Sequence, residues 1–274
     1  MSECNHDCAH CSSKCENEIK KLEPNDRSSV RKVIGVVSGK GGVGKSLVTS
    51  LLAVGLNKGD NRVAILDADI TGPSIPQAFG IHEHAIGEDN LIYPHRSDNG
   101  VEIVSANMFV ENEDDPIIWR GSMISQMVMQ FFTDVLWEDI DYMVVDMPPG
   151  TGDVALTIFQ SLPVDGIVIV TSPQELVSMI VKKAVKMANL MNIPVLGIVE
   201  NMSYVECPSC NEKIEIYGKS HLEDIAKEYN LEILGRIPLN PTIAQNVDAG
   251  LVEEIDANKY LSALITKVEK LEGK

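Results

Sequence analysis

The chain has 274 residues, enough for one large domain or two small ones with a well-buried core. It carries 23 Lys and Arg against 40 Asp and Glu, a net charge of −17 at pH 7, and this acidity disfavours non-specific binding to nucleic acid or anionic lipid. Its apolar runs are strand-sized, far below the ~20 residues of a membrane-spanning helix. The opening Met1-Ser2-Glu3 is acidic and polar, unlike a signal peptide. We therefore expect a cytoplasmic protein with no nucleic-acid and no membrane partner.

Residues 1–29 are polar and lack apolar periodicity, which predicts a flexible, cysteine-rich N-terminal tail and linker. From there on, short β-branched runs alternate with helical patterns. Several of the strand candidates are continuous apolar runs, which is typical of strands buried on both faces. The alternation predicts an α/β fold, a mostly parallel β-sheet with helices on both faces. Strands are predicted at 33–38, 63–66, 101–105, 142–145, 166–171, 195–199 and 232–234, and helices near 45–58, 122–137, 153–161, 174–191, 219–229, 241–248 and 258–271.

Two apolar patterns are predicted to be structural rather than functional. Methionines are flexible side chains that fill irregular gaps, so five of them are predicted to lie in the core or in an interface. The apolar spacing of the last helix predicts that it docks on the core rather than on a membrane surface. The methionines are Met108, Met123, Met127, Met129 and Met143, and the helix residues are Leu261, Leu264, Ile265, Val268 and Leu271.

The first predicted strand runs directly into a segment with the pattern G-x-x-x-x-G-K-[ST], followed by a helical pattern. Glycines in such a loop let backbone N–H groups approach a phosphate closely, and the helix dipole favours the same anion. Lys45 is expected to contact the β- and γ-phosphates of ATP, and the Ser46 hydroxyl to bind Mg²⁺. The nucleotide-binding residues expected here are Gly39, Lys40, Gly41, Gly42, Val43, Gly44, Lys45, Ser46 and Leu47.

Aspartates follow two further strands, where ligands of such sheets bind. Asp146 is expected to hold Mg²⁺ through a water, because a carboxylate at the end of an apolar strand is the usual partner of this ion. Asp69 or Asp67 is then available to orient the attacking water, and Asp69 is assigned to catalysis. Each aspartate alone is equally explained as a helix cap or turn residue. Two such loops behind a phosphate-binding loop favour the functional interpretation.

The six cysteines form two groups, and clustered thiols in a reducing compartment indicate metal binding rather than disulfides. Cys207-x-x-Cys210 supplies two ligands, whereas tetrahedral zinc or a cubane cluster takes four. Either other residues complete the site or two subunits share it. A zinc knuckle that stiffens the loop and a reactive dithiol are the alternatives.

The tail holds a four-cysteine set that can bind metal without a second subunit. Its spacing approaches the bacterial ferredoxin run, but its first gap is one residue longer and no proline follows the last cysteine. An iron–sulfur cluster, zinc and no metal all stay open, with His6 and His10 as substitute ligands. The cysteines are Cys4, Cys8, Cys11 and Cys15.

These motifs together resemble a known family. Lys40-Gly41-Gly42-Val43-Gly44-Lys45-Ser46 is similar to the deviant Walker A loop of ATPases that include division-site, plasmid-partition and nitrogenase-iron-protein members. Over about residues 31–250 the chain resembles the Mrp/ApbC-type, or nucleotide-binding-protein type, iron–sulfur cluster carriers. The segments that carry this resemblance are Asp67–Ser74, Asp146–Asp153, Asn201-Met202-Ser203 and Cys207-Pro208-Ser209-Cys210.

The resemblance implies a P-loop ATPase domain at 30–274, with a dimer-bridging cysteine insertion near 201–217. It implies that Lys40 reaches across a homodimer interface to the partner's nucleotide, and that Asn201 contacts adenine beside backbone near Pro238. It also implies a labile [4Fe–4S] cluster held by Cys207 and Cys210 of two subunits, received from a scaffold and passed to apo-proteins. From the residues alone, Asn201 is equally explained as a turn former. From the residues alone, Lys40 of another subunit would stabilise charge on the γ-phosphate, as an arginine finger does. The alternative is that Lys40 is an ordinary solvated lysine of the loop.

The sequence thus predicts a homodimeric Mg²⁺-ATPase with slow, switch-type turnover that carries an iron–sulfur cluster. One alternative is a Min/Par-type positioning ATPase, which needs a basic surface or an amphipathic anchor. Others are an ATP-driven electron donor like the nitrogenase iron protein and a zinc-stiffened ATPase with another client. The recipients, the cluster donor, the step that hydrolysis drives and the role of Trp119-Arg120-Gly121 do not follow from the sequence.

Overall fold

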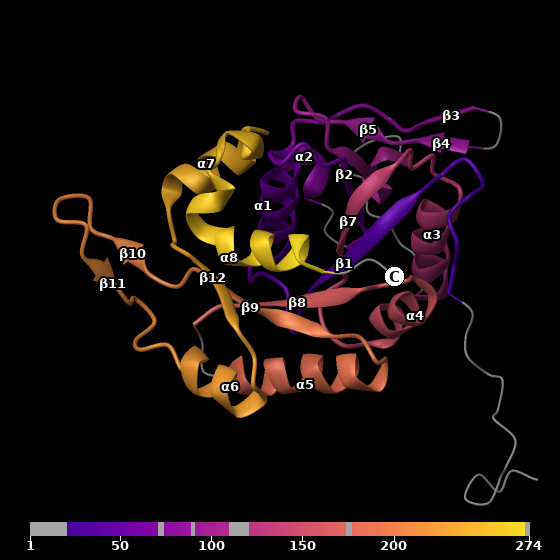
Figure 1. Cartoon of the computed structure of the whole chain (residues 1–274). Helices are drawn as coiled ribbons and strands as arrows, with labels where there is room; N and C mark the ends of the chain where they lie inside the picture. Colours follow the sequence, from indigo (N-terminus) through magenta and orange to yellow (C-terminus); the bar gives the residue numbers. More distant parts are fainter. Residues whose placement is uncertain (1–20, 71–73, 89–90, 110–120, 174–176, 272–274) are drawn as a thin grey trace, which may run out of the picture.

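An eight-stranded sheet forms the centre of the molecule (Figure 1). The computed structural model describes residues 21–70, 74–88, 91–109, 121–173 and 177–271. The strand order is β12-β9-β8-β1-β7-β2-β6-β5, and every neighbouring pair is parallel except β5 with β6. The strands are β1 Val30–Ser38, β2 Val63–Asp67, β5 His95–Arg96, β6 Glu102–Ser105, β7 Ile140–Asp146, β8 Gly166–Thr171, β9 Val195–Asn201 and β12 Ile233–Ile237.

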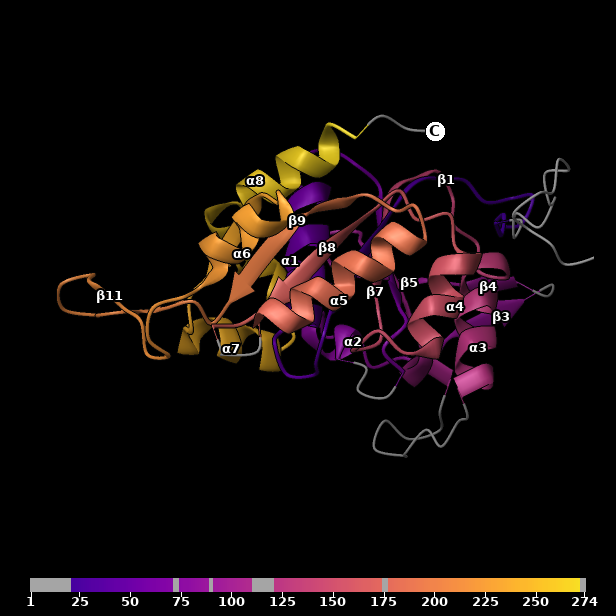
Figure 2. The same cartoon turned by 90° about the horizontal axis from the view of Figure 1, so that it is seen from below.

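Helices cover both faces of this sheet (Figures 1 and 2). One face packs against α1 Lys45–Asn57, α2 Ile75–Ala78, α7 Pro241–Asp248 and α8 Ala257–Glu269, and the other against α3 Gly121–Thr133, α4 Asp153–Ser161, α5 Val177–Leu190 and α6 Leu222–Tyr229. Successive residues of β1 alternate between the two cores: Ile34 and Val36 in one, Val33 and Val37 in the other. The predicted parallel α/β sheet with helices on both faces is therefore confirmed.

The remaining elements of the described ranges are short. Two 3₁₀ turns, η1 Ala106–Phe109 and η2 Val252–Glu254, lie between the longer elements. Two small hairpins stand outside the main sheet: β3 Ile86–Glu88 with β4 Leu91–Tyr93, and β10 Val205–Glu206 with β11 Lys213–Ile214. The sequence predicts none of the hairpin strands, because two or three residues are too few to establish a periodicity.

The helix predicted at 122–137 is too long, since α3 ends at Thr133. The chain after it turns away to hydrogen-bond with Ile92, whose N–H donates to the Asp134 carbonyl and whose carbonyl accepts from Leu136. The last helix does dock on the core as predicted, with Leu261, Leu264, Ile265 and Val268 buried. Among the described residues, no helix is both long and apolar enough to cross a membrane.

The described part of the predicted linker contacts the domain. The Leu22 N–H donates to the Ser161 carbonyl at 2.8 Å, and the Asn25 amide donates to the carbonyls of Thr133 and Val135. The boundary at residue 29 stays a prediction, and residues 21–29 follow the surface of the domain.

Candidate functional site

The predicted nucleotide-binding residues converge at the carboxyl ends of the parallel strands. The phosphate-binding loop joins β1 to α1. Asp67 ends β2 and pairs in register with Asp146, which ends β7. Asn201 ends β9 on the other side of β1. Residues separated by more than 150 positions thus meet at one edge of the sheet, where α/β proteins bind their ligands.

Three glycines of the loop, Gly39, Gly42 and Gly44, are required for steric reasons. Gly42 and Gly44 have φ angles of 78° and 80°, a left-handed conformation that side chains rarely adopt. A Cβ on Gly39 would lie 2.1 Å from Cγ2 of Ile180, so the loop and α5 approach too closely for any larger residue. A Cβ on Gly44 would lie 2.0 Å from the Asn201 amide nitrogen. The loop is therefore fixed from two sides, by α5 and by the end of β9.

A buried ion-pair network occupies the start of α1. The Lys45 side chain is 5% exposed, and its Nζ lies 2.8 Å from Asp146 Oδ1 and 3.2 Å from Asp69 Oδ2. Asp146 also accepts hydrogen bonds from the hydroxyls of Ser46 and Thr49, each at 2.7 Å. Burial lowers the pKa of Lys45, but the charges of Asp146 and Asp69 outweigh this effect and raise it, so the lysine stays charged.

Asp67 is as deeply buried as Asp146, whereas the Asp69 side chain is 13% exposed. Burial and the neighbouring charge of Asp146 raise its pKa to about 8, although Lys45 and a hydrogen bond from Ser105 act in the opposite direction. The Ser105 hydroxyl donates to Asp67 Oδ2 at 2.8 Å, and the Asp69 N–H donates to Oδ1 at 3.1 Å. Asp67 thus holds a proton more tightly than an ordinary carboxyl, and it orients the backbone of Asp69.

Two hydroxyls in this network escape sequence reasoning. Thr49 lies one helical turn after Lys45, so its side chain shares the face of α1 that points to Asp146. Ser105 ends β6, which pairs with β2 so that Ser105 lies opposite Asp67. A polar residue at the carboxyl end of a buried strand was the available signal for Ser105. For Thr49 the signal was its spacing of four from Lys45.

The other predicted nucleotide residues surround this centre. Asn201 is 3% exposed and donates from Nδ2 to the Val43 carbonyl at 3.0 Å. Met202 follows with a φ of 55°, and the Ser203 N–H donates to the Ile237 carbonyl beside the buried Pro238. Half-buried Lys40 and Leu47 flank the central part of the loop. The structure therefore brings Asn201 against the phosphate-binding loop and the segment before Pro238 beside Ser203, just after the end of β9.

The two late cysteines lie on a hairpin that projects from the body in both views (Figures 1 and 2). Cys207 and Asn211 close the turn, because the Asn211 N–H donates to the Cys207 carbonyl at 2.8 Å. Cys207 is half-buried and Cys210 exposed, and neither forms a disulfide. Within the described ranges, no third His, Cys, Asp or Glu joins them in a group that could hold a metal.

The hairpin turn activates one of these thiols. Backbone N–H groups of Ser209 and Cys210, and then the Cys210 thiol, lower the pKa of Cys207. These donors favour the thiolate, the form in which cysteine binds metals and clusters. The structure thus provides two thiols suited to ligation on a small surface hairpin, apart from the buried nucleotide site.

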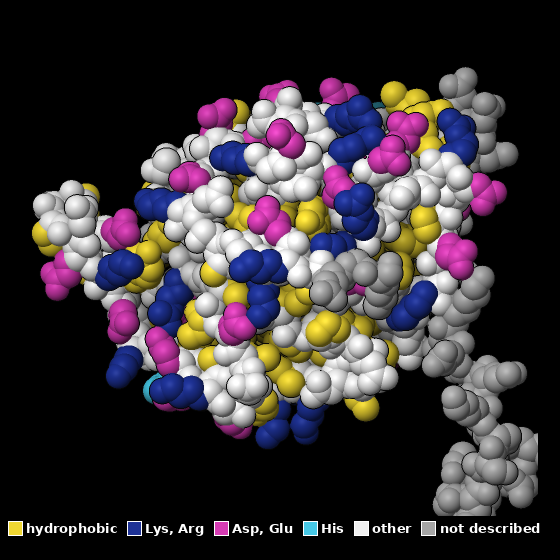
Figure 3. Space-filling model, viewed as in Figure 1, with side chains coloured by type: hydrophobic (Ala, Val, Ile, Leu, Met, Phe, Trp, Pro, Cys, Tyr) yellow, Lys and Arg dark blue, Asp and Glu magenta, His cyan; other side chains and the backbone are white. Residues whose placement is uncertain are grey.

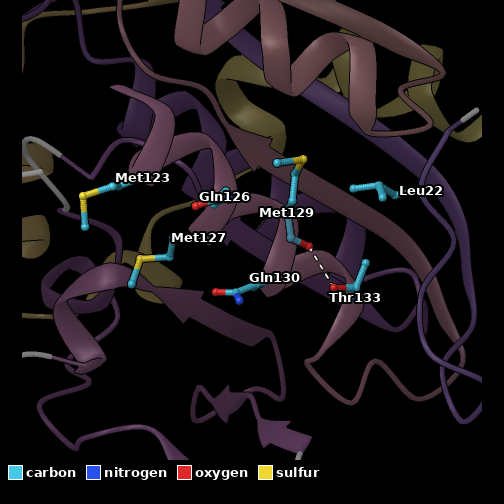
Figure 4. A pocket seen from close by; sticks show the side chains of 7 residues that line it. All are labelled: Leu22, Met123, Gln126, Met127, Met129, Gln130 and Thr133. Atoms are coloured by element: carbon cyan, nitrogen blue, oxygen red, sulfur yellow. Dashed lines mark hydrogen bonds between the residues drawn. The ribbon is translucent and has the colours of Figure 1, made fainter. Parts of the chain in front are cut away.

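Several predicted positions lie outside the described residues: the four tail cysteines Cys4, Cys8, Cys11 and Cys15, and Trp119 and Arg120. The five methionines predicted to lie in the core or an interface occupy two kinds of site. Met108 and Met143 are buried in the two cores, whereas Met123, Met127 and Met129 line a surface groove of about 430 Å³ along α3 (Figure 4). None of the seven residues lining this groove belongs to the nucleotide site.

A parallel sheet with a G-x-x-x-x-G-K-[ST] loop after its central strand, and aspartates ending two neighbouring strands, defines a P-loop NTPase. Residues 29–271 match the family model described as "ParA: NUBPL iron-transfer P-loop NTPase". The chain belongs to this family and is a P-loop ATPase.

Curated relatives agree with this family. An "iron-sulfur cluster carrier protein" of Clostridium perfringens is 41% identical over 277 residues, which cover 94% of this chain and 97% of the relative. A protein of the same name from Methanocaldococcus jannaschii is 40% identical, with 100% of this chain and 99% of the relative covered.

Solved structures confirm the fold. A nucleotide-binding protein from Archaeoglobus fulgidus in complex with ADP has a TM-score of 0.75 and 39% identity, covering 85% of this chain and 92% of that chain. The cell-division ATPase MinD of Pyrococcus furiosus has a TM-score of 0.59 at 21% identity, covering 88% and 99%. At that identity the similarity to MinD concerns the fold alone.

Proposed function

We propose that this protein is an ATP-dependent iron–sulfur cluster carrier that holds a [4Fe–4S] cluster between two copies of the chain and transfers it to apo-proteins. The observation that carries the proposal is the exposed Cys207-x-x-Cys210 turn, with its low-pKa thiol, on a P-loop ATPase of an iron-transfer family. Each chain contributes two thiolates, and a cubane cluster takes four. Two turns related by a two-fold axis complete the ligand set.

The nucleotide site has named roles in this proposal. Lys45 binds the β- and γ-phosphates, the loop from Gly39 to Leu47 surrounds them, and Asn201 with the backbone at Pro238 binds adenine. Lys40 acts on the nucleotide of the partner subunit. Asp69, 13% exposed at its side chain, orients the attacking water.

Mg²⁺ fits the same end of the sheet. The Ser46 hydroxyl and the Asp146 carboxylate are hard oxygen donors 2.7 Å apart, the ligand type that this ion prefers. Bound there with ATP, the ion would neutralise charge on the phosphate oxygens during transfer. Thr49 keeps Asp146 oriented, and Asp67 positions the backbone of Asp69.

Exposure of the cysteine turn suits a cargo rather than a permanent cofactor. A cluster held at the surface between two chains is released by separating them, without unfolding either. ATP binding and hydrolysis would switch the dimer between a holding and a releasing geometry, which gives slow turnover. The unpaired thiols favour a reducing compartment such as the cytosol. The tail cysteines Cys4, Cys8, Cys11 and Cys15 remain candidates for a second cluster or zinc.

The rival function, a Min/Par-type positioning ATPase, draws on the fold similarity to MinD. It requires a basic surface or an amphipathic anchor. On the face in Figure 3 Lys and Arg are interspersed with Asp and Glu, and the apolar residues of α8 are buried. The iron-transfer family favours the carrier.

The proposal is tested by anaerobic reconstitution of the full chain with iron and sulfide, followed by measurement of Fe, acid-labile sulfide and Zn per dimer. Two variants are compared with wild type: Cys207→Ser/Cys210→Ser, and a variant with the four tail cysteines changed to Ser. About four Fe and four sulfides per dimer, lost only in the Cys207/Cys210 variant and transferable to an apo-protein, are expected. Tight zinc without visible absorption after reconstitution would leave a zinc-stiffened ATPase instead.

A further inference from the structure

The cysteine hairpin is weakly held by its own structure. Its strands have two residues each, and short isolated hairpins are at best marginally stable. An open cavity of about 320 Å³ separates its base from the body, between Tyr204 and Lys213 on the hairpin side and Glu223 and Arg236 on the body side. The position of the cysteine turn therefore depends on how the two ends of the hairpin segment, near Ser203 and Ser220, are attached to the body.

Both ends are attached to one buried carboxylate. Glu200 on β9 has no exposed surface. The Ser203 hydroxyl, just before the hairpin, donates to Glu200 Oε2 at 2.5 Å. The Ser220 hydroxyl, just after it, donates to Oε1. Ser220 Oγ in turn accepts from the Leu222 N–H at 3.2 Å, so the same hydroxyl also caps the start of α6.

A cation from the next strand completes the arrangement. Arg236 on β12 lies in register with Glu200, with its Nε 3.6 Å from Oε2, and it also pairs with Glu223 on α6. A buried carboxylate that lacked such partners would be strongly unfavourable. The network is thus satisfied only when both ends of the hairpin and α6 are in place.

The residue after Glu200 holds the nucleotide loop. Asn201 donates to the Val43 carbonyl, and its amide fills the space over Gly44. Successive side chains of a strand point to opposite faces, so the end of β9 bonds the phosphate loop with one side chain and the hairpin ends with the other. The residues that hold the two sites, Glu200 and Asn201, are therefore adjacent in the chain and both buried.

We infer that Glu200 is a positioning residue that makes the geometry of the cysteine turn depend on occupancy of the nucleotide site. A nucleotide that displaces the Asn201 amide from the loop shifts the end of β9, and Glu200 passes this shift to Ser203 and Ser220. The inference rests on the proposed function for its biological meaning, since it identifies the element that links ATP to the cluster ligands. The coupling itself involves only this chain and a nucleotide.

The test follows the thiols without any cluster. Iodoacetamide alkylation of Cys207 and Cys210 in the full, metal-free chain is timed by peptide-resolved mass spectrometry, with and without saturating Mg-ADP or Mg-ATPγS. In wild type the nucleotide changes the rate by about 5-fold or more, the low end of measured site-to-site couplings. Because no cluster is present, the alkylation rates do not depend on whether the protein can be reconstituted with iron and sulfide. A negative result in either experiment therefore does not change the interpretation of the other.

Two variants test the carboxylate and its hydroxyl partner. In Glu200→Gln and in Ser220→Ala the nucleotide effect falls below about 2-fold, while nucleotide affinity stays within about 3-fold of wild type. Ser220→Ala leaves the contacts of Ser203 and Arg236 with Glu200 in place. It therefore tests the inference even if Glu200→Gln does not fold. Ser220→Thr, which retains the hydroxyl, restores the wild-type response. Ser161→Ala is the matched control, since it removes one hydroxyl that donates to a carbonyl at 2.9 Å in α4, away from both sites.

A merely structural role has a different signature. Loosening the hairpin would speed alkylation equally in both nucleotide states, so the ratio of the two rates would not change. The inference is overturned by a wild-type rate that ignores the nucleotide, or by a Ser220→Ala variant that responds as wild type does.

Discussion

The nucleotide end of the sheet and the cysteine hairpin are built on opposite principles. At the nucleotide end, Lys45 and Asp146 are buried and bonded to each other, and Ser46 and Thr49 hold the same carboxylate. On the hairpin, Cys207 and Cys210 lie at the surface in the turn between two strands of two residues each. Phosphate chemistry needs groups held in fixed positions, whereas the proposed cluster transfer needs ligands that another protein can reach. Substitutions at the two regions should therefore have very different consequences.

Lys45→Ala should produce the largest effect. It leaves Asp146 and Asp69 without their buried cation, so the free energy of unfolding should drop by about 3–5 kcal/mol. ATP affinity should fall by about 100-fold or more. Urea denaturation and nucleotide titration measure the two effects. Lys58→Ala, an exposed lysine just after the same helix, is the control that should change little; a Lys45→Ala protein that binds ATP normally would contradict the assigned role.

Asp67→Asn should change the pH dependence of stability. The pKa of Asp67 is raised to about 8 in the folded protein from an ordinary value of 3.8, so the folded state binds more protons between these values. Wild-type stability should therefore fall as pH rises from about 4 to about 8, and the variant should lose this component. One pKa unit is worth about 1.4 kcal/mol. Between pH 5 and 7, the free energy of unfolding of Asp67→Asn should therefore rise by more than about 1 kcal/mol relative to that of wild type.

The measurement for Asp67→Asn is urea denaturation across this pH range in EDTA without nucleotide. Exposed Asp248→Asn serves as control and should leave the slope as in wild type. A parallel pH profile for Asp67→Asn and wild type would refute the role assigned to burial.

Thr49→Val should have an intermediate effect. The change keeps the shape of the side chain but removes the hydroxyl that donates to Asp146 Oδ1, which should cost about 1 kcal/mol of stability. ATP hydrolysis should slow by about 3- to 10-fold with a smaller change in ATP affinity, because Asp146 loses its orientation rather than its charge. Steady-state hydrolysis assays measure both quantities. Thr49→Ser should recover most of the activity, and a Thr49→Val enzyme with unchanged turnover would argue against a positioning role.

Cys207→Ser/Cys210→Ser should have the smallest effect on the fold. Because the turn is exposed and its thiols pack against little, the free energy of unfolding should stay within about 0.5 kcal/mol of wild type. ATP affinity of the metal-free protein should also be unchanged. Thermal and urea denaturation in the presence of EDTA check the first point. A large decrease in the free energy of unfolding would mean that the cysteines stabilise the fold. It would contradict the difference inferred between the nucleotide end of the sheet and the cysteine hairpin.

Sequence reasoning finds what depends on local pattern. The strand ending at Ser38, the loop from Gly39 to Ser46 and the aspartates Asp67 and Asp146 are visible because each motif is contiguous and follows an apolar run. The structure places them at one edge of the sheet, as the parallel arrangement requires.

Partners that depend on register across the sheet are not visible in this way. Ser105 meets Asp67 only because β6 pairs with β2, and Ser220 meets Glu200 only because the hairpin returns to the strand it left. Neither pair has a characteristic spacing along the chain. The small strands of the hairpin are missed for a related reason, since two residues carry no period.

The way the hairpin is anchored has a consequence for its evolution. Its two ends meet at the Glu200 carboxylate, so their separation is set by the body and not by the length of chain between them. Closing a loop whose ends are already fixed costs only about 0.6 kcal/mol for each doubling of its length. The chain between Ser203 and Ser220 can therefore be lengthened or shortened on either side of Cys207 and Cys210 while the ATPase domain stays the same.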